Sequence, residues 1–71
     1  MNIINTVLAT RIRKLQDSLK AENAISEENA KKVEELGLGN HNLYSSAIRV
    51  LVKNGTIIET NDGRYYLNQD K

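Results

Sequence analysis

The segment from Leu43 to Leu67, LYSSAIRVLVKNGTIIETNDGRYYL, constrains the fold more than any other part of the chain. Its apolar residues recur at helical spacing up to an Asn-Gly pair at 54–55, and glycine just after such a pattern is typical of a helix end. Two runs rich in β-branched and aromatic residues follow, separated by an Asn-Asp-Gly turn signal at 61–63. The segment therefore predicts one helix followed by one β-hairpin.

The composition excludes several kinds of site. The chain has 71 residues, which suffice for one domain with a small core. It contains no cysteine, which excludes disulfides, thiolate catalysis and Cys-based zinc sites, and its single histidine, His41, excludes a His-rich metal cluster. We therefore expect a single domain over residues 1–71, without a metal or a cofactor.

Residues 3–21 are expected to form the first helix. Ile3 and Val7 lie beside its apolar stripe and make the first two turns apolar over a wider arc than one core face requires. These two residues either contact a second copy of the chain across a two-fold axis, which is the interpretation we prefer, or pack under the hairpin or fray. The stripe itself consists of Ile4, Leu8, Ile12, Leu15 and Leu19.

Residues 27–36 are expected to form the second helix. Ser26 is a good N-cap, and Glu27 and Glu28 place carboxylates in the first turn, where the positive helix end favours them. Gly37 supplies the left-handed stop. We interpret the charged outer face as a solvated surface, with docking of a protein partner as the alternative.

Residues 41–54 are expected to form the third helix, with Asn40 or Asn42 as its cap. On a helical wheel, the inward arc consists of Leu43, Tyr44, Ala47, Ile48, Val50 and Leu51. The opposite arc consists of Asn42, Ser45, Ser46, Arg49 and Lys53. Small serines let a helix approach DNA closely, arginine can contact guanine or phosphate, and lysine supplies a point charge. This arc therefore suits either an ordinary solvated face or a nucleic-acid contact.

Residues 56–68 are expected to form the hairpin. With a period of two, Tyr65 and Leu67 face the core, while Arg64 and Tyr66 face outward. Which isoleucine of the pair at 57–58 joins the core depends on whether the loop has two or three residues. At the tip, Arg64 suits either a phosphate or minor-groove contact, or a stem on which Tyr66 packs.

The predicted elements bring one set of apolar residues together. At this chain length, the core supports a free energy of unfolding of only about 3–5 kcal/mol. The expected core consists of Leu8, Ile12, Leu15, Leu19, Val33, Leu36, Leu43, Ala47, Leu51, Tyr65 and Leu67.

The chain contains, in order, a capped helix, a short turn, a helix of the form LYSSAIRVLVKNG and the run TIIETNDGRYYL. Together these features resemble the winged helix-turn-helix superfamily over about residues 12–68. The resemblance implies an α+β, mainly α fold, in which three helices precede a two-stranded antiparallel β-hairpin. In this family the second helix of the pair enters the major groove of duplex DNA, and the hairpin, or wing, contacts the adjacent backbone or minor groove. The resemblance implies base-facing roles for Asn42, Ser45, Ser46 and Arg49, and phosphate-contacting roles for Lys53 and Arg64.

The leading functional interpretation is a small protein that binds double-stranded DNA and regulates transcription. The net charge is only +1, from ten basic and nine acidic residues, which favours nucleic acid less than a strongly basic domain would. The alternative is therefore a winged-helix protein-interaction module or accessory subunit that does not bind DNA. Few aromatic residues are expected on the surface, which argues against base stacking on single strands of RNA.

Catalysis, secretion and membrane binding are not expected. His41 has no identifiable nucleophile or orienting partner, and there is no glycine-rich phosphate loop. No apolar run is long enough to span a bilayer, and the N-terminal segment lacks a secretory pattern. The basic amphipathic segment at 4–20 also suits a membrane surface, but its apolar stripe is needed for the core. We therefore expect a cytoplasmic protein that is not an enzyme.

Overall fold

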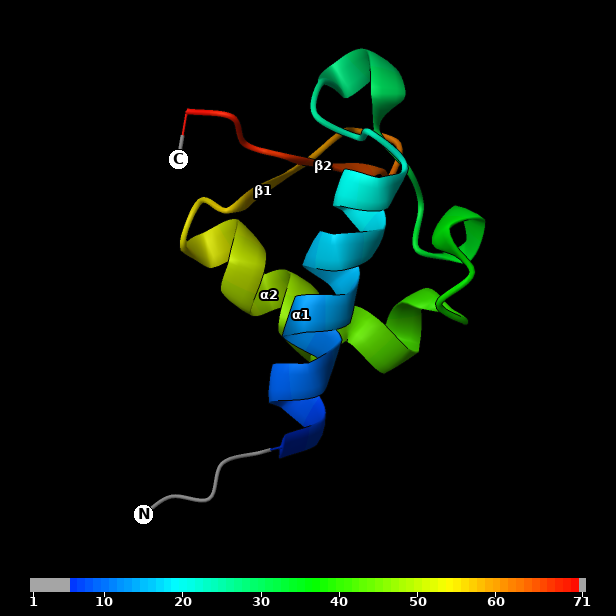
Figure 1. Ribbon diagram of the computed structural model, residues 1–71, viewed down its shortest axis with the longest axis vertical. Helices are drawn as coiled ribbons and strands as arrows, with labels where there is room; N and C mark the ends of the chain where they lie inside the picture. The colour runs from blue at the N-terminus through cyan, green and yellow to red at the C-terminus, as the bar shows by residue number, and fades with distance from the viewer. Residues whose placement is uncertain (1–5, 71) are drawn as a thin grey trace.

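The computed structural model describes residues 6–70, which form a mainly helical α+β fold (Figure 1). Two α-helices and a two-stranded hairpin are joined by segments that contain short 3-10 turns. In chain order, the elements are α1 (Thr6–Ala21), the turns η1 (Glu27–Asn29), η2 (Glu34–Leu36) and η3 (His41–Tyr44), α2 (Ser45–Lys53), β1 (Ile57–Glu59) and β2 (Tyr65–Leu67).

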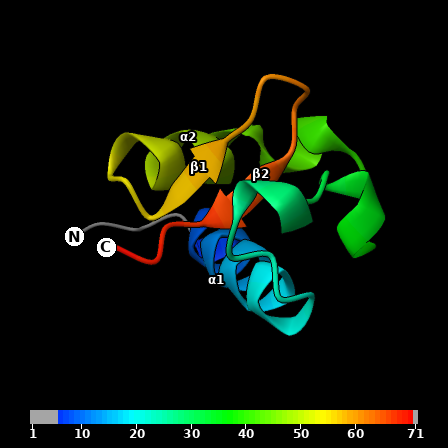
Figure 2. The same ribbon diagram turned by 90° about the horizontal axis from the view of Figure 1, so that it is seen from above.

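The two helices cross, and the hairpin closes one end of the space between them. In Figure 1, α2 crosses α1 near the middle of α1, the hairpin lies at the upper end, and the first turns of α1 extend below α2. Seen from above, the hairpin lies over the space between α1 and α2, and its loop projects beyond α2 on the side away from α1 (Figure 2). The apolar face of α2 packs against α1 and β1, and its opposite face remains uncovered.

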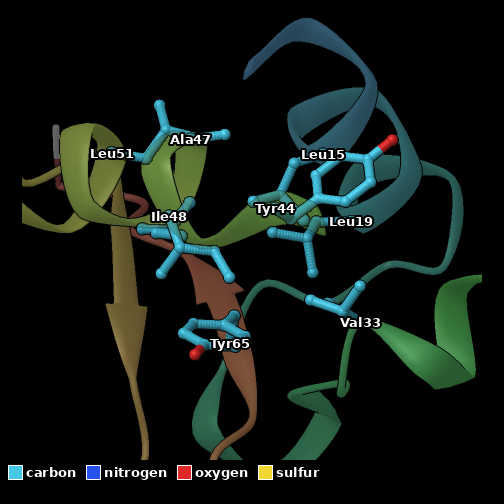
Figure 3. Close-up of a cluster of buried hydrophobic side chains, with 10 residues drawn as sticks. Leu15, Leu19, Val33, Tyr44, Ala47, Ile48, Leu51 and Tyr65 are labelled. Carbon is cyan, nitrogen blue, oxygen red and sulfur yellow. The ribbon is translucent and has the colours of Figure 1, made fainter. Parts of the chain in front are cut away.

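The core lies where α1, α2 and the hairpin meet (Figure 3). Six expected core residues are confirmed as buried: Leu15, Leu19, Val33, Ala47, Leu51 and Tyr65. Four others are partly buried and pack against this core: Leu8, Ile12, Leu36 and Leu67. The prediction for Leu43 is wrong, because its side chain is 47% exposed and Tyr44 lies in the core instead. Residues 41–44 form a 3-10 turn with three residues per turn, so a wheel drawn for an α-helix misplaces Leu43.

The predicted helix over residues 27–36 is wrong. This segment instead contains η1 and η2, and the backbone between them pairs with β2. The Lys31 N–H donates to the Tyr65 carbonyl at 2.9 Å, and the Tyr65 N–H donates to the Lys31 carbonyl at 2.8 Å. A third bond runs from the Leu67 N–H to the Ala24 carbonyl at 2.8 Å. Partners on this second edge of β2 satisfy buried backbone groups, which outweighs the local helical preference of the segment.

The first and third predicted helices agree with the structure over most of their length. The described part of the first is α1, while residues 3–5 of the prediction lie outside the described residues. The third begins as η3 and continues as α2 to Lys53. Of the two candidate caps, Asn40 is the one used, since its Oδ1 accepts the Leu43 N–H at 3.1 Å. The glycine at 55 has a φ of 82°, as expected for a left-handed helix stop.

The hairpin has a three-residue loop, which decides between the two isoleucines. Thr60 and Arg64 close the loop through a bond from the Thr60 N–H to the Arg64 carbonyl at 2.8 Å. Gly63 has a φ of 81°, the left-handed conformation that such loops require at this position. In the resulting register Ile57 pairs with Leu67, and Ile57 is only 1% exposed. Ile57 is therefore the isoleucine that joins the core.

Candidate nucleic-acid interface

The start of helix α2 is fixed by a contact from α1. The Arg11 Nη1 donates to the Leu43 carbonyl at 2.9 Å, and the guanidinium carbon lies 5.9 Å from the centre of the Tyr44 ring. Such a cation–π contact adds to the hydrogen bond in holding the two segments together. The first residues of the candidate interface therefore have a defined position relative to α1.

The uncovered face of η3 and α2 is polar and positively charged. The five residues predicted there are all exposed: Asn42, Ser45, Ser46, Arg49 and Lys53. The Ser45 hydroxyl donates to the Asn42 carbonyl at 3.2 Å, so its side chain stays close to the helix. Within residues 6–70, neither Arg49 nor Lys53 has an ion-pair partner. The face therefore combines short side chains, which permit close approach, with two cations that are available to a ligand.

Two valines border this face, and one of them departs from expectation. Val50 was expected to point inward, but its side chain is 38% exposed. Val52 is exposed to a similar extent. Val50 is exposed because only the narrow stripe of Ala47, Ile48 and Leu51 on α2 faces the core. The core is too small to cover a wider arc of the helix.

The hairpin tip carries a paired charge. The Arg64 Nε lies 3.0 Å from the Asp62 Oδ2, an ion pair whose geometry is not that of a well-directed hydrogen bond. The Thr60 hydroxyl donates to the other Asp62 oxygen. This hydrogen bond, followed by the charge of Arg64, lowers the pKa of Asp62 below its ordinary value. The tip therefore presents a largely neutralised pair, whereas Arg49 and Lys53 on α2 have no ion-pair partner among residues 6–70.

A polar chain joins the residues before α2 to the hairpin. The Tyr65 hydroxyl lies 3.0 Å from the His41 Nε2 and donates to the Glu59 Oε2 at 3.4 Å. The His41 and Tyr65 rings stack with centroids 6.2 Å apart. On its other side, the His41 N–H donates to the Glu34 Oε2 at 3.1 Å. His41 thus helps to position α2, a role that the sequence pattern did not suggest because its partners come from distant elements.

The buried Tyr65 gives the protein an alkaline limit. Burial, followed by the charge of Glu59, raises the pKa of Tyr65 from 10.0 to about 12. The folded state therefore holds the phenolic proton more tightly than the unfolded state does. This contribution to stability is present in full below pH 10.0 and is lost as the pH rises toward about 12. We expect the urea midpoint to fall over this range, as followed by circular dichroism.

The Tyr65→Phe variant is the control for this pH dependence. It keeps the ring in the core and removes the ionising group, while every other residue stays the same. The difference between the two proteins therefore isolates Tyr65. Equal losses of stability in both proteins between neutral pH and the alkaline range would rule out this role.

Comparison with known proteins gives no relative. No protein-family model matches the chain, and neither the curated proteins nor the solved structures contain a significant match. Across residues 6–70, no helix combines the length and the apolar character needed to cross a membrane. The same part of the chain contains no group of three or more side chains arranged to hold a metal ion.

Proposed function

We propose that this protein is a small DNA-binding protein that uses one helix and a hairpin wing in the manner of winged helix-turn-helix proteins, with 3-10 turns in place of the first helix of the pair, and that it regulates transcription by occupying sites on duplex DNA. Helix α2 enters the major groove, and the hairpin contacts the adjacent backbone. The observation that carries the proposal is the uncovered face of α2, where Arg49 and Lys53 lack ion-pair partners among the described residues.

The chemistry of this face fits a major groove. The groove is wide enough for one α-helix, and its base edges offer acceptors to a forked guanidinium. In this arrangement Asn42, Ser45, Ser46 and Arg49 face the bases. Lys53 and Arg64 face phosphates, which supply much of the affinity of such complexes. Because Asp62 already pairs with Arg64, we expect Arg64 to contribute less than Lys53 does.

Two substitutions on α2 test the proposal. Arg49→Ala should weaken binding to a short mixed-sequence duplex and reduce the preference at one base position, at a cost of about 1–3 kcal/mol. Lys53→Ala should weaken binding to all sequences alike and make the plot of log affinity against log salt shallower by about one. Fluorescence anisotropy at several salt concentrations measures both effects.

Lys20→Ala is the matched control, because it removes the same charge from the end of α1, away from the uncovered face of α2. It should leave the affinity and the salt dependence nearly unchanged. If wild-type protein binds no duplex at low salt, or if all three variants bind equally well, the proposed function is wrong.

A second candidate is a protein-interaction module, and one observation favours it. Val7 on α1 is 56% exposed, although the structure places it beside other apolar residues. The predicted two-fold dimer through Ile3 and Val7 remains a proposal, because Ile3 lies outside the described residues. A stoichiometric complex with a protein, without any affinity for duplex DNA, would favour this candidate.

A further inference from the structure

An apolar groove lies between the first turns of α1 and the segment that leads into α2. Val7 and Leu43 come from different elements, are 56% and 47% exposed, and line the same depression of about 340 Å³. Leu38 and Tyr44 line it as well. Gly39 leaves room for the Leu43 side chain, since a Cβ at this position would lie 3.1 Å from the Leu43 Cδ1. We call this depression the α1–η3 groove.

The polar side chains around the α1–η3 groove carry one sign of charge. Arg11 and Lys14 line it, together with the hydroxyls of Thr6 and Thr10. None of the described side chains that line it is a carboxylate. Arg11 donates one N–H to the Leu43 carbonyl but keeps its charge, and Lys14 has no ion-pair partner within residues 6–70. The groove thus combines an apolar surface with two cations.

The groove continues toward the start of α2. A smaller depression of about 150 Å³ shares Val7, Arg11 and Leu43 with it and extends to Ser45 and Ser46. The two adjoining depressions follow α1 and η3, which suits an extended or helical segment of chain better than a compact small molecule. Val7 and Leu43 remain exposed to water, so a ligand that covers them gains from the hydrophobic effect.

We propose that the α1–η3 groove binds an acidic amphipathic segment of a partner protein. Apolar side chains of the segment cover Val7 and Leu43, and its carboxylates pair with Arg11 and Lys14. A second copy of this chain fits less well, because a two-fold axis through the groove brings the same two cations together from both copies. Like charges at an interface disfavour the complex, whereas opposite charges select the partner.

An amide NMR titration of the isotopically labelled full chain, without nucleic acid, tests this proposal. The probe is a synthetic helical peptide of leucine and glutamate with its leucines on one face, and the matched peptide has glutamine in place of glutamate. The acidic peptide should shift the amides of Val7, Thr10, Leu38 and Leu43. The glutamine peptide should bind several-fold more weakly, since it keeps the apolar contact and loses the charges.

Variants locate the contact. Leu43→Ser and Val7→Ser change exposed side chains, so the fold should persist, and each should weaken binding of the acidic peptide. Lys14→Glu should weaken binding strongly, whereas Lys20→Glu makes the same change on the same helix outside the groove and should have little effect.

Four outcomes would overturn the proposal. They are the absence of shifts, shifts confined to another surface, equal binding of the two peptides, and equal effects of Lys14→Glu and Lys20→Glu. Shifts of the groove amides with protein concentration alone would instead identify a second copy as the occupant. Since no DNA is present, these results are independent of the duplex-binding experiment.

Discussion

Leu51→Ala should lower the free energy of unfolding by about 2–5 kcal/mol, and Leu43→Ala by about 0.5 kcal/mol or less. Leu51 is 2% exposed and belongs to the buried cluster, so truncation leaves a cavity in a small core. Leu43 lies in the α1–η3 groove, where its truncation removes contact with water rather than with the core. A domain of this size has only about 3–5 kcal/mol of stability, so Leu51→Ala should remove a large part of it.

Urea denaturation followed by circular dichroism measures both variants. They form a matched pair, because the same substitution is made at two positions that the sequence pattern assigned to the same core. If both variants lose similar amounts of stability, Leu43 is buried and the description of η3 is wrong. If Leu51→Ala melts cooperatively with little loss, the packing of α2 is wrong.

Lys31→Pro should cost about 1–3 kcal/mol, because it removes the donor that pairs with the carbonyl of buried Tyr65. The preceding residue, Ala30, has a ψ of 149°, a conformation that proline accepts in its neighbour. The variant loses the hydrogen bond across the second edge of β2. Amide exchange at Leu67 should also accelerate, since its bond to the Ala24 carbonyl lies on the same edge.

Glu27→Pro is the control for this substitution. Glu27 opens η1, where an N–H has no partner inside the turn, and Ser26 before it is extended, with φ −150° and ψ 165°. Proline there should change stability by less than about 0.5 kcal/mol. Carbon chemical shifts that are continuously α-helical over residues 27–36 would contradict the pairing of Lys31 with Tyr65.

The residues proposed to contact nucleic acid were largely accessible to sequence reasoning. Helical periodicity depends only on local geometry, so the exposure of Ser46, Arg49 and Lys53 follows from their spacing relative to the apolar residues of α2. The ion pair of Arg64 could not be predicted from the sequence. Its pairing with Asp62 depends on the shape of a three-residue loop, which the sequence left open beside a two-residue alternative.

The α1–η3 groove was not apparent from the sequence. The apolar pattern marks Val7 as an extra apolar residue on α1 but predicts Leu43 to lie in the core, whereas Leu43 is exposed. The two residues meet only because η3 is wound as a 3-10 turn and because Arg11 holds it against α1. Such a contact between distant segments leaves no periodic signal in either one.

The sequence by itself determined the two α-helices, the presence of the hairpin and most of the core. Each of these depends on short-range patterns such as apolar period, capping and left-handed glycines. Only the tertiary structure decided the conformation of residues 27–36, because their capping and charge pattern by itself favours a helix. The unpaired edge of β2 required partners for its buried backbone groups, and Ala24 and Lys31 supplied them. A buried N–H or C=O without a partner costs more free energy than a short helix gains from local propensity. Residues 27–36 therefore pair with β2 instead of forming a helix.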